Sequence, residues 1–261
     1  MQRIGSVFFK FFLLFCHSQT GQIRSVSEAL EKHRCFFYNA DMDKIKLCIF
    51  DMDGLLIDSE KIYLFSALAC SEKYGYRIPE ELIYRTMGNN EAETKNRFLQ
   101  TMGGDFPFDE FLEKEWVIHQ DYLLHHPMEK KKGVDELLSY LEKEKIAKAV
   151  ATSTQRYYAD QYLKSVGLDG RFDHIVYGDD LKESKPRPEI YLKAAAAFPY
   201  KKEEILAFED SGNGILSAVS AGLKVVHIPD LADVADEVKE KSFAVLDDLS
   251  QAVKLIEGMN R

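Results

Sequence analysis

Six short apolar runs, separated by amphipathic stretches, constrain the fold of this chain more than any other feature of its sequence. Each run is nearly continuous in apolar residues, as expected for strands that are covered by helices on both faces. The runs cover residues 47–50, 147–151, 174–177, 205–208, 225–228 and 243–246. Between them, apolar residues repeat at helical spacing, for example at Val134, Leu137 and Leu141. The alternation predicts an α/β fold, in which a Rossmann-like parallel sheet is flanked by helices.

The interval between the first and second runs breaks this alternation. Residues 54–146 show helical periodicity, at Leu64 and Leu68 and again over residues 111–124, but no convincing strand. We therefore expect an inserted helical cap domain over residues 58–127, and a Rossmann-like core formed by residues 44–57 and 128–261. The basic cluster at residues 130–132 lies at the exit of the cap, where a solvated linker is the expected structure.

Residues 1–43 differ from the rest and are interpreted as a leader or as a mis-called N-terminal extension. An apolar run over residues 7–16 follows Arg3, and no acidic residue precedes Glu28, which is typical of a targeting segment. However, Lys10 interrupts the run, no small-residue cleavage pattern follows it, and it is far shorter than the roughly 20 residues of a membrane helix. We expect no stable membrane span. Translation from Met42 is the favoured interpretation, because a buried strand follows almost at once, and targeting by residues 1–41 is the alternative.

Charge and cysteine content exclude several classes of protein. The 34 basic and 43 acidic residues give a formal net charge of -9, which provides no general attraction for nucleic acid or for an anionic membrane. The four cysteines show no CxxC pair and no spacing that suits a zinc site or a disulfide framework. The sequence therefore indicates a reduced, cytoplasmic protein without a nucleic-acid partner. It specifies no oligomeric state.

Two carboxylates, Asp51 and Asp53, follow the first apolar run directly. The carboxyl ends of the strands are where an open α/β sheet binds its ligands. A spacing of two residues puts both side chains on one side of an extended segment, and Gly54 allows a sharp turn after them. Carboxylates this close repel each other unless a cation or a shared proton intervenes. A hard, oxygen-seeking ion such as Mg²⁺ is the expected cofactor.

Polar groups also follow other predicted strands. Thr152 and Ser153 come after the second run and offer hydroxyls and backbone amides to phosphoryl oxygens. Lys185 precedes a proline and supplies a positive point charge, while Glu209 and Asp210 follow the fourth run and offer carboxylates to a metal. The ends of parallel strands meet at one edge of the sheet, so these groups predict a single site for phosphate and metal.

Four segments, in this order, resemble the motifs of the haloacid dehalogenase-like hydrolase superfamily. They are DMDGLLIDSE at residues 51–60, AVATST at 149–154, SKPRPEIY at 184–191 and FEDSGNGI at 208–215. Any one of them alone would be a weak signal, but four matches in order are highly specific, and the resemblance covers almost everything from Lys44 to the C-terminus. The helical insert is similar to the C1 cap of the subfamily that includes β-phosphoglucomutase and many sugar-phosphate phosphatases.

This resemblance implies a Mg²⁺-dependent phosphatase that acts through an aspartyl-phosphate. Asp51 would attack phosphorus, and Asp53 would protonate the leaving oxygen and later take a proton from the hydrolytic water. The implied Mg²⁺ ligands are a carboxylate oxygen of Asp51, the backbone carbonyl of Asp53, and Asp210 with help from Glu209. The transferring phosphoryl group would be bound by Thr152, Ser153 and Lys185.

Two departures from the mutase pattern favour hydrolysis. β-Phosphoglucomutases carry a histidine where this chain has Tyr63, and a cap arginine in a segment that matches residues 87–91, where this chain has Glu91. Tyr63 cannot replace the histidine at neutral pH. The resemblance therefore favours hydrolysis of a monophosphate, with a phosphomutase as the alternative. The chain is also similar to pseudouridine 5′-phosphatases and to 2-deoxyglucose-6-phosphate phosphatases, and both a sugar phosphate and a nucleoside monophosphate stay open.

An alternative of another class is a phospho-accepting receiver domain, which also places an aspartate, a hydroxyl and a lysine around Mg²⁺. The second acid at Asp53, the long insert and the pair Glu209–Asp210 argue against such a switch. Within the insert, polar side chains are the candidate contacts of the leaving group, namely Glu60, Tyr63, Tyr84, Asn89 and Asn90. Trp116 and His119 are expected to serve packing or to be exposed.

Overall fold

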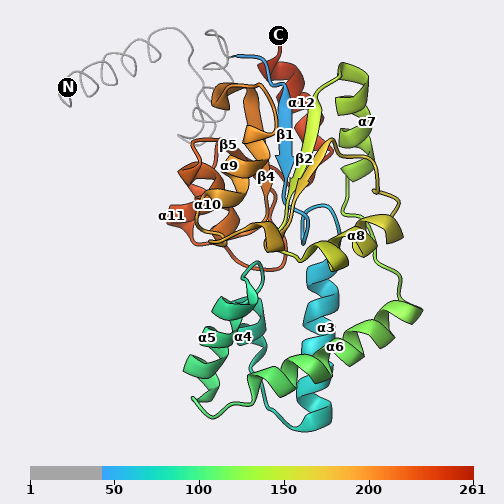
Figure 1. Ribbon diagram of the computed structural model, residues 1–261, viewed down its shortest axis with the longest axis vertical. Helices are drawn as coiled ribbons and strands as arrows, with labels where there is room; N and C mark the ends of the chain where they lie inside the picture. The colour runs from blue at the N-terminus through green and yellow to red at the C-terminus, as the bar shows by residue number, and fades with distance from the viewer. Residues whose placement is uncertain (1–42) are drawn as a thin grey trace, which may run out of the picture. The chain divides into compact units, whose positions relative to one another are not determined.

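The computed structural model describes residues 43–261, in which six parallel strands form one sheet (Figure 1). The strands are β1 (Leu47–Phe50), β2 (Ala147–Ala151), β3 (His174–Val176), β4 (Ile205–Glu209), β5 (Lys224–His227) and β6 (Ala244–Val245). Their order across the sheet is β3-β2-β1-β4-β5-β6. The predicted α/β class and the six predicted strands are confirmed, and each strand end agrees with the prediction or differs from it by one residue.

Strand β1 lies at the centre of the sheet and pairs with β2 on one side and β4 on the other. Leu47 is in register with Ala147 and with Ile205. The connections reverse direction across the sheet beside β1, because β2 and β3 continue to one edge and β4 to β6 to the other. The carboxyl end of β1 is therefore a topological switch point, where an open α/β sheet forms its binding crevice.

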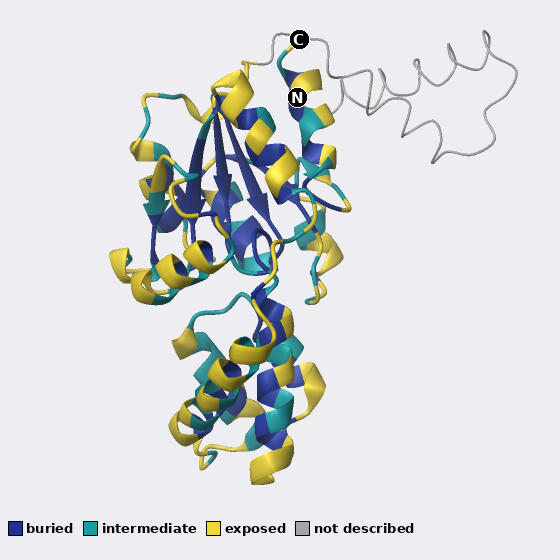
Figure 2. Cartoon of the chain, turned by 90° about the vertical axis from the view of Figure 1, so that its right-hand side faces the viewer, coloured by how far each residue is buried: buried dark blue, intermediate teal, exposed yellow. Residues whose placement is uncertain are grey.

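Helices cover both faces of the sheet, which explains why its strands are apolar throughout. Leu47 and Ile49 point into a core cluster with residues of α9 (Glu189–Ala196) and α10 (Gly212–Ser220), while Phe50 stacks on Phe208 with ring centroids 4.9 Å apart. The helices that follow the insert are α7 (Val134–Glu144), α8 (Arg156–Ser165), α9 (Glu189–Ala196), α10 (Gly212–Ser220), α11 (Asp236–Lys239) and α12 (Gln251–Met259), with short 3₁₀ turns at Gly178–Asp180 and Lys202–Glu204. Burial concentrates on the strands and on the inner sides of these helices (Figure 2).

Four helices fill the interval that was predicted to be a cap, and no strand interrupts residues 59–125. They are α3 (Ser59–Tyr74), α4 (Glu80–Tyr84), α5 (Glu91–Met102) and α6 (Phe108–His125). These helices pack around a cluster of their own, in which the rings of Phe98 and Phe111 stack at 5.2 Å. They lie below the carboxyl end of the sheet in the view of Figure 1.

The two linkers between the sheet and the four helices run side by side. Ile57 and Lys130 form an antiparallel bridge, and the Asp58 amide donates to the Glu129 carbonyl at 2.9 Å. Lys131 lies between two carboxylates, 3.2 Å from Asp58 and 2.5 Å from Asp230. The expectation of a simply solvated linker was wrong for Lys131, whose side chain is only 24% exposed. Two carboxylates at hydrogen-bond distance hold this ammonium in place.

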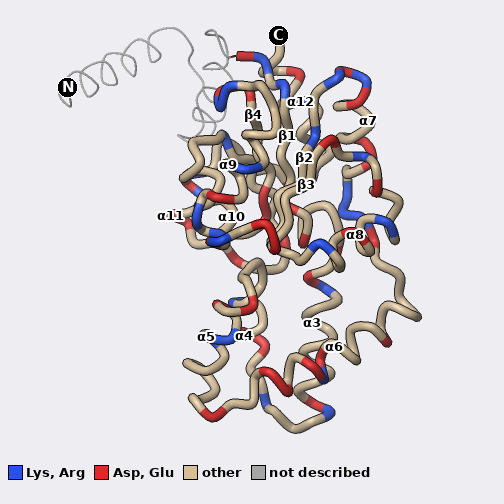
Figure 3. The backbone as a smooth tube through the Cα atoms, viewed as in Figure 1, with Lys and Arg blue, Asp and Glu red and all other residues tan. Residues whose placement is uncertain are grey.

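Basic and acidic residues are interspersed along the described backbone (Figure 3). Cys48 and Cys70 are free and buried. Among residues 43–261, no helix is both long and apolar enough to cross a bilayer. The apolar run at residues 7–16 and the proposed start at Met42 lie outside the described residues.

Candidate active site

Asp51 and Asp53 leave the carboxyl end of β1, where the backbone turns sharply. The Asp51 amide donates to the Phe208 carbonyl at 3.0 Å, which continues the pairing of β1 with β4. Gly54 then adopts a φ of +75°, and a Cβ atom there would lie 2.5 Å from Asp210 Oδ2. Glycine is therefore required twice, for the left-handed backbone and for the approach of the Asp210 carboxylate.

Lys185 bridges the end of β1 to the end of β4. Its ammonium donates to Asp51 and, at 2.6 Å, to Glu209, and the residue is 4% exposed. Burial lowers the pKa of Lys185, but the charges of Asp51 and Glu209 raise it by more, so the net direction is upward. The Tyr191 hydroxyl donates to the same Glu209 oxygen at 2.5 Å. Lys185 therefore stays positively charged beside the Asp51 carboxylate.

Asp51, Glu209 and Asp210 form a buried acidic cluster in which one oxygen of each lies within 4.8 Å of the others. The pKa of Asp51 is raised to about 8, mainly by burial and then by the charges of Glu209 and Asp53, although the nearby Lys185 ammonium lowers it. Burial and the charges of Asp51 and Glu209 also hold the pKa of Asp210 well above its usual range. Asp51 and Asp210 therefore take up protons more readily than usual, because Lys185 alone does not balance the charge of the ionised carboxylates.

This cluster could hold a divalent cation, and Asp210 fits that role better than Glu209. Within residues 43–261, the Asp210 carboxylate accepts no hydrogen bond, although the residue is 5% exposed. Glu209, in contrast, receives Lys185 and Tyr191 on one oxygen and Ser211 on the other, at 3.2 Å. Three carboxylates at one point are a donor set that suits a hard cation. Asp210 is therefore the carboxylate with free lone pairs.

Three hydroxyl groups hold the Asp53 carboxylate. Ser59 donates to Oδ1 at 2.8 Å, and Thr152 and Thr154 donate to Oδ2 at 3.2 and 2.7 Å. Thr152 is fully buried and does not line the cavity, whereas Ser153 and Thr154 do. The structure thus places Thr152 beside Asp53 rather than on the open side of the site. Ser59 and Thr154 were missed by the sequence analysis, although Thr154 follows Thr152 at the spacing that puts two side chains on one side of an extended segment.

A cavity of about 600 Å³ opens between these strand ends and the four inserted helices. Asp51, Asp53, Lys185 and Asp210 line it from the sheet side. From the other side it is lined by four of the five predicted leaving-group contacts, namely Glu60, Tyr63, Asn89 and Asn90. Tyr84 is not among the lining residues, because its hydroxyl turns to Glu80 at 3.0 Å. The expectation for Tyr84 was therefore wrong.

The two inner candidates, Glu60 and Tyr63, lie on the first two turns of α3. Glu60 accepts a hydrogen bond from the Gly88 amide at 3.1 Å. Burial, reinforced by the charge of Asp53, raises the pKa of Glu60 to about 8. The Tyr63 hydroxyl lies 3.4 Å from Thr86 Oγ1. The raised pKa favours the protonated form of Glu60, which can donate a hydrogen bond into the cavity.

The two outer candidates, Asn89 and Asn90, differ in what their side chains contact. Asn90 is the N-cap of α5 and accepts from the Glu93 amide at 2.9 Å. Asn89 accepts from the Asn213 side chain of α10 at 2.7 Å, and so joins the insert to the sheet side of the cavity. Asn90 therefore has a structural task that its sequence position alone did not reveal.

Replacing Asn90 by alanine is expected to lower the free energy of unfolding by about 1 kcal/mol, because the Glu93 amide loses its acceptor. Asn90→Asp keeps an acceptor at the cap and serves as the matched control. Urea unfolding of the two variants measures the difference. An Asn90→Ala protein of unchanged stability but raised KM would instead assign the side chain to the substrate.

Aromatic residues that the sequence analysis set aside also line the cavity. Trp116 and His119 of α6 face it together with Tyr158 and Tyr162 of α8. Helical spacing alone predicts an apolar stripe on α6, but it does not tell which neighbour that stripe meets. These four rings bring the insert into contact with the segment that follows Thr154.

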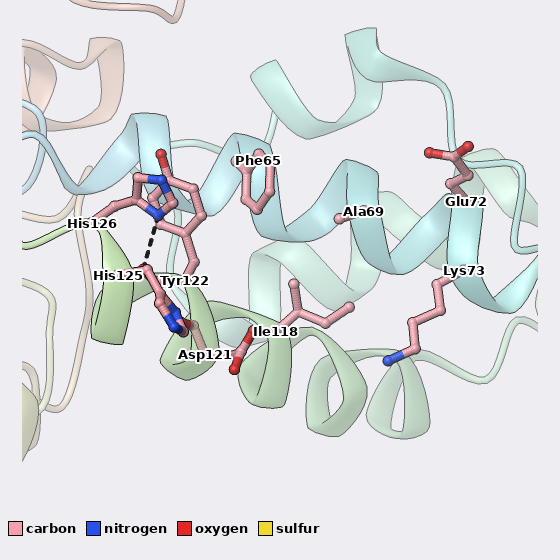
Figure 4. A pocket seen from close by; sticks show the side chains of 9 residues that line it. All are labelled: Phe65, Ala69, Glu72, Lys73, Ile118, Asp121, Tyr122, His125 and His126. Atoms are coloured by element: carbon pink, nitrogen blue, oxygen red, sulfur yellow. Dashed lines mark hydrogen bonds between the residues drawn. The ribbon is translucent and has the colours of Figure 1, made fainter.

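A second hollow, of about 590 Å³, lies between α3 and α6 on the insert alone (Figure 4). Phe65 and Tyr122 approach each other there with ring centroids 4.3 Å apart, and Tyr122 stacks on His126 at 4.1 Å. No residue of the acidic cluster lines this hollow. It is therefore separate from the candidate active site.

Comparisons with known proteins agree with this geometry. A family model described as haloacid dehalogenase-like hydrolase matches residues 48–228. The chain is 32% identical to a phosphorylated carbohydrates phosphatase of Thermotoga maritima, over 69% of this chain and 82% of the relative. It is also 32% identical to a protein of Drosophila melanogaster named "Probable pseudouridine-5'-phosphatase", over 74% of this chain and 85% of the relative. The solved β-phosphoglucomutase of Clostridium difficile has the same fold, with a TM-score of 0.68 and 21% identity over 83% of this chain and 97% of that one.

Proposed function

Because the chain belongs to the haloacid dehalogenase-like hydrolase family and is a phosphoric monoester hydrolase, we propose a mechanism for it. It dephosphorylates its small substrate through an aspartyl-phosphate on Asp51, with Mg²⁺ as cofactor. One observation carries the proposal. The Asp51 carboxylate accepts a hydrogen bond from the Lys185 ammonium and lies within 4.8 Å of carboxylate oxygens of Glu209 and Asp210, with Asp53 two residues away. This arrangement offers a nucleophile, a cation for the phosphoryl oxygens and a second acid within one buried site.

In the first step, a carboxylate oxygen of Asp51 attacks phosphorus while the bond to the leaving oxygen breaks. Asp53 gives its proton to that oxygen, so the leaving group departs as a neutral alcohol. The Lys185 ammonium offsets the charge that develops on the phosphoryl oxygens. In the second step, Asp53 takes a proton from water, the water oxygen attacks phosphorus, and Asp51 returns to a free carboxylate.

The surroundings of Asp53 support this division of labour. Its carboxylate is held by three hydroxyl donors and points into the cavity beside Asp51. The fixed position is what a group needs if it is to reach first the leaving oxygen and then the attacking water. Ser153 and Lys185 face the same cavity and are the proposed phosphoryl contacts, whereas Thr152 acts through Asp53.

The proposed Mg²⁺ ligands are Asp51, the backbone carbonyl of Asp53, and Asp210, with Glu209 nearby. The ion would supply Lewis-acid stabilisation of the phosphoryl charge. Binding of Mg²⁺ at this point is supported by the raised pKa values of Asp51 and Asp210, whose carboxylates lack a sufficient counter-charge. The lone pairs of Asp210 that accept no hydrogen bond from the described residues support it further.

Removal of the metal is expected to stop phosphate release. We expect EDTA to abolish activity and added Mg²⁺ to restore it, because the acidic cluster would otherwise repel the substrate phosphate. Asp210→Asn should raise the Mg²⁺ concentration required for half-maximal activity, while Asp247→Asn, at an exposed position, should not. Full activity of a protein that has been freed of metal would contradict the proposed cofactor.

We further propose that residues 58–127 act as a cap over the cavity. The four helices have their own aromatic cluster, and two paired linkers attach them to residues 43–57 and 128–261. A cap of this kind excludes water and positions the leaving group. The candidate contacts Glu60, Tyr63 and Asn89 lie on it, so the cap is the proposed source of substrate selection. A phosphorylated carbohydrate or a nucleoside monophosphate fits the polar side chains there.

Hydrolysis rather than transfer is supported by Tyr63 and Glu91, which replace the histidine and arginine of the mutase pattern.

A panel of sugar phosphates, nucleotides and pseudouridine 5′-phosphate, scored by released phosphate, identifies the substrate. Isomerisation of glucose 1-phosphate run alongside detects a mutase. A single burst without further turnover would instead favour a receiver-like switch. The cytoplasmic location stays a prediction.

A further inference from the structure

His119 joins a buried carboxylate of the insert to a tyrosine on the other side of the cavity. On α6, Glu115 Oε1 lies 3.6 Å from His119 Nδ1, and Glu115 is 3% exposed. The Ser66 hydroxyl of α3 donates to the same Glu115 oxygen. The other imidazole nitrogen, Nε2, lies 3.3 Å from the Tyr162 hydroxyl of α8. Three side chains therefore form a continuous polar chain from α6 to α8.

The surroundings favour one direction for the hydrogen bond between His119 and Tyr162. A buried carboxylate beside Nδ1 favours the tautomer that carries its proton there, as in other carboxylate–imidazole pairs. Nε2 is then an acceptor, and the Tyr162 hydroxyl is its donor. Burial, and then the charges of Asp53 and Glu115, raise the pKa of Tyr162, so the phenol keeps the proton that it donates.

An aromatic contact runs parallel to this polar one. Trp116 stacks on His119 with ring centroids 5.2 Å apart, and the edge of Tyr158 meets Trp116 at 4.8 Å. Tyr158 and Tyr162 both belong to α8, which begins two residues after Thr154. Thr154 in turn donates to Asp53. The contact between α6 and α8 therefore lies next to the segment that holds the proposed acid and base.

We propose that Glu115, His119 and Tyr162 form a latch that holds the insert against α8, with His119 as a positioning residue for the reaction. The inference rests on the proposed function for its kinetic consequence, but the contact itself is independent of it. Glu115 orients the imidazole, and the imidazole accepts from Tyr162 across the cavity. Loss of the latch reduces the fraction of molecules in which the cavity is closed, and the apparent affinity for substrate falls by the same fraction.

Trp116, the only tryptophan of the chain, provides a test that does not depend on activity. Tyr162→Phe removes the hydroxyl donor without changing either ring that contacts Trp116 directly. We expect acrylamide to quench Trp116 fluorescence more strongly in Tyr162→Phe than in the parent protein, and equally strongly in Tyr162→Phe combined with Glu115→Gln. Tyr157→Phe, at an exposed neighbouring tyrosine, should leave the quenching unchanged. Unchanged quenching in Tyr162→Phe would overturn the latch.

A double-mutant cycle tests the kinetic consequence. His119→Ala and Tyr162→Phe should each raise KM by about 3- to 10-fold, the range of one lost hydrogen bond, with little change in kcat because saturating substrate restores closure. The KM of the double variant should be no higher than that of the single variant with the higher KM. His119→Gln keeps an acceptor and should therefore have a lower KM than His119→Ala. His125→Ala, at an exposed position of the same helix, is the control. If the KM increases of the two single variants multiplied in the double variant, the latch would be overturned. A parent protein that releases phosphate from no ester would count against the proposed function alone, because the fluorescence test of the latch does not depend on activity.

Discussion

Asp51→Asn is expected to lower kcat for phosphate release by at least about 10⁴-fold, because an amide cannot attack phosphorus and carries no charge. The fold should survive the change. Lys185 keeps its partner Glu209 at 2.6 Å, and the variant removes one of several carboxylates that repel each other in the buried cluster. Phosphate release under saturating substrate measures the loss, and thermal unfolding of the same preparation shows whether the protein is intact.

A matched control separates the chemistry from the substitution itself. Asp247→Asn makes the same change at an exposed position, where the side chain accepts a hydrogen bond from Gln251, and it should retain parental activity. If Asp51→Asn kept near-parental turnover, the nucleophile would have to be another group. The hydroxyls of Ser153 and Thr154, which line the cavity, would then be the first candidates for the nucleophile.

Asp53→Asn is expected to slow turnover by about 10²- to 10⁴-fold, the usual contribution of a positioned acid and base. The effect should depend on the leaving group. An alkyl phosphate needs a proton on its leaving oxygen, whereas 4-nitrophenolate departs without one. The first step should therefore be slowed much more for the alkyl ester than for 4-nitrophenyl phosphate. Hydrolysis of the phosphoenzyme should be slow for both, because the water loses its base.

Rapid mixing with 4-nitrophenyl phosphate distinguishes the two steps. The variant should show a burst of nitrophenolate close to one equivalent of enzyme, followed by slow turnover. The hydroxyls of Ser59, Thr152 and Thr154 can rotate to accept from the new amide, so the side chain should stay in place. Equal loss for alkyl and aryl esters, without a burst, would argue against Asp53 as the acid and base.

The sheet and the strand ends could be predicted because local patterns determine them. An apolar run bounded by polar turns identifies β1 and β4, and Asp51 and Asp210 follow those runs in the sequence. Helical spacing likewise predicted the insert. Parallel sheets bring the carboxyl ends of their strands to one edge, so the meeting of Asp51 with Lys185 followed from topology. These groups lie 134 residues apart in the chain.

Other features depend on contacts that no local pattern records. Thr154 reaches Asp53 only because β2 lies beside β1. His119 meets Tyr162 only when α6 lies against α8, so its spacing on α6 was consistent with ordinary packing. Lys131 belonged to a basic cluster in the sequence, and its partner Asp230 lies 99 residues away. Such pairs are determined by tertiary structure, and sequence periodicity does not specify them.

The stereochemical course at phosphorus tests the covalent step through Asp51 most directly. A substrate whose transferred phosphoryl group is made chiral with oxygen isotopes and sulfur is hydrolysed, and the configuration of the released thiophosphate is determined. Attack by Asp51 followed by attack by water gives two in-line displacements, so net retention of configuration is expected. Net inversion would mean a single displacement by water and would contradict an aspartyl-phosphate on Asp51.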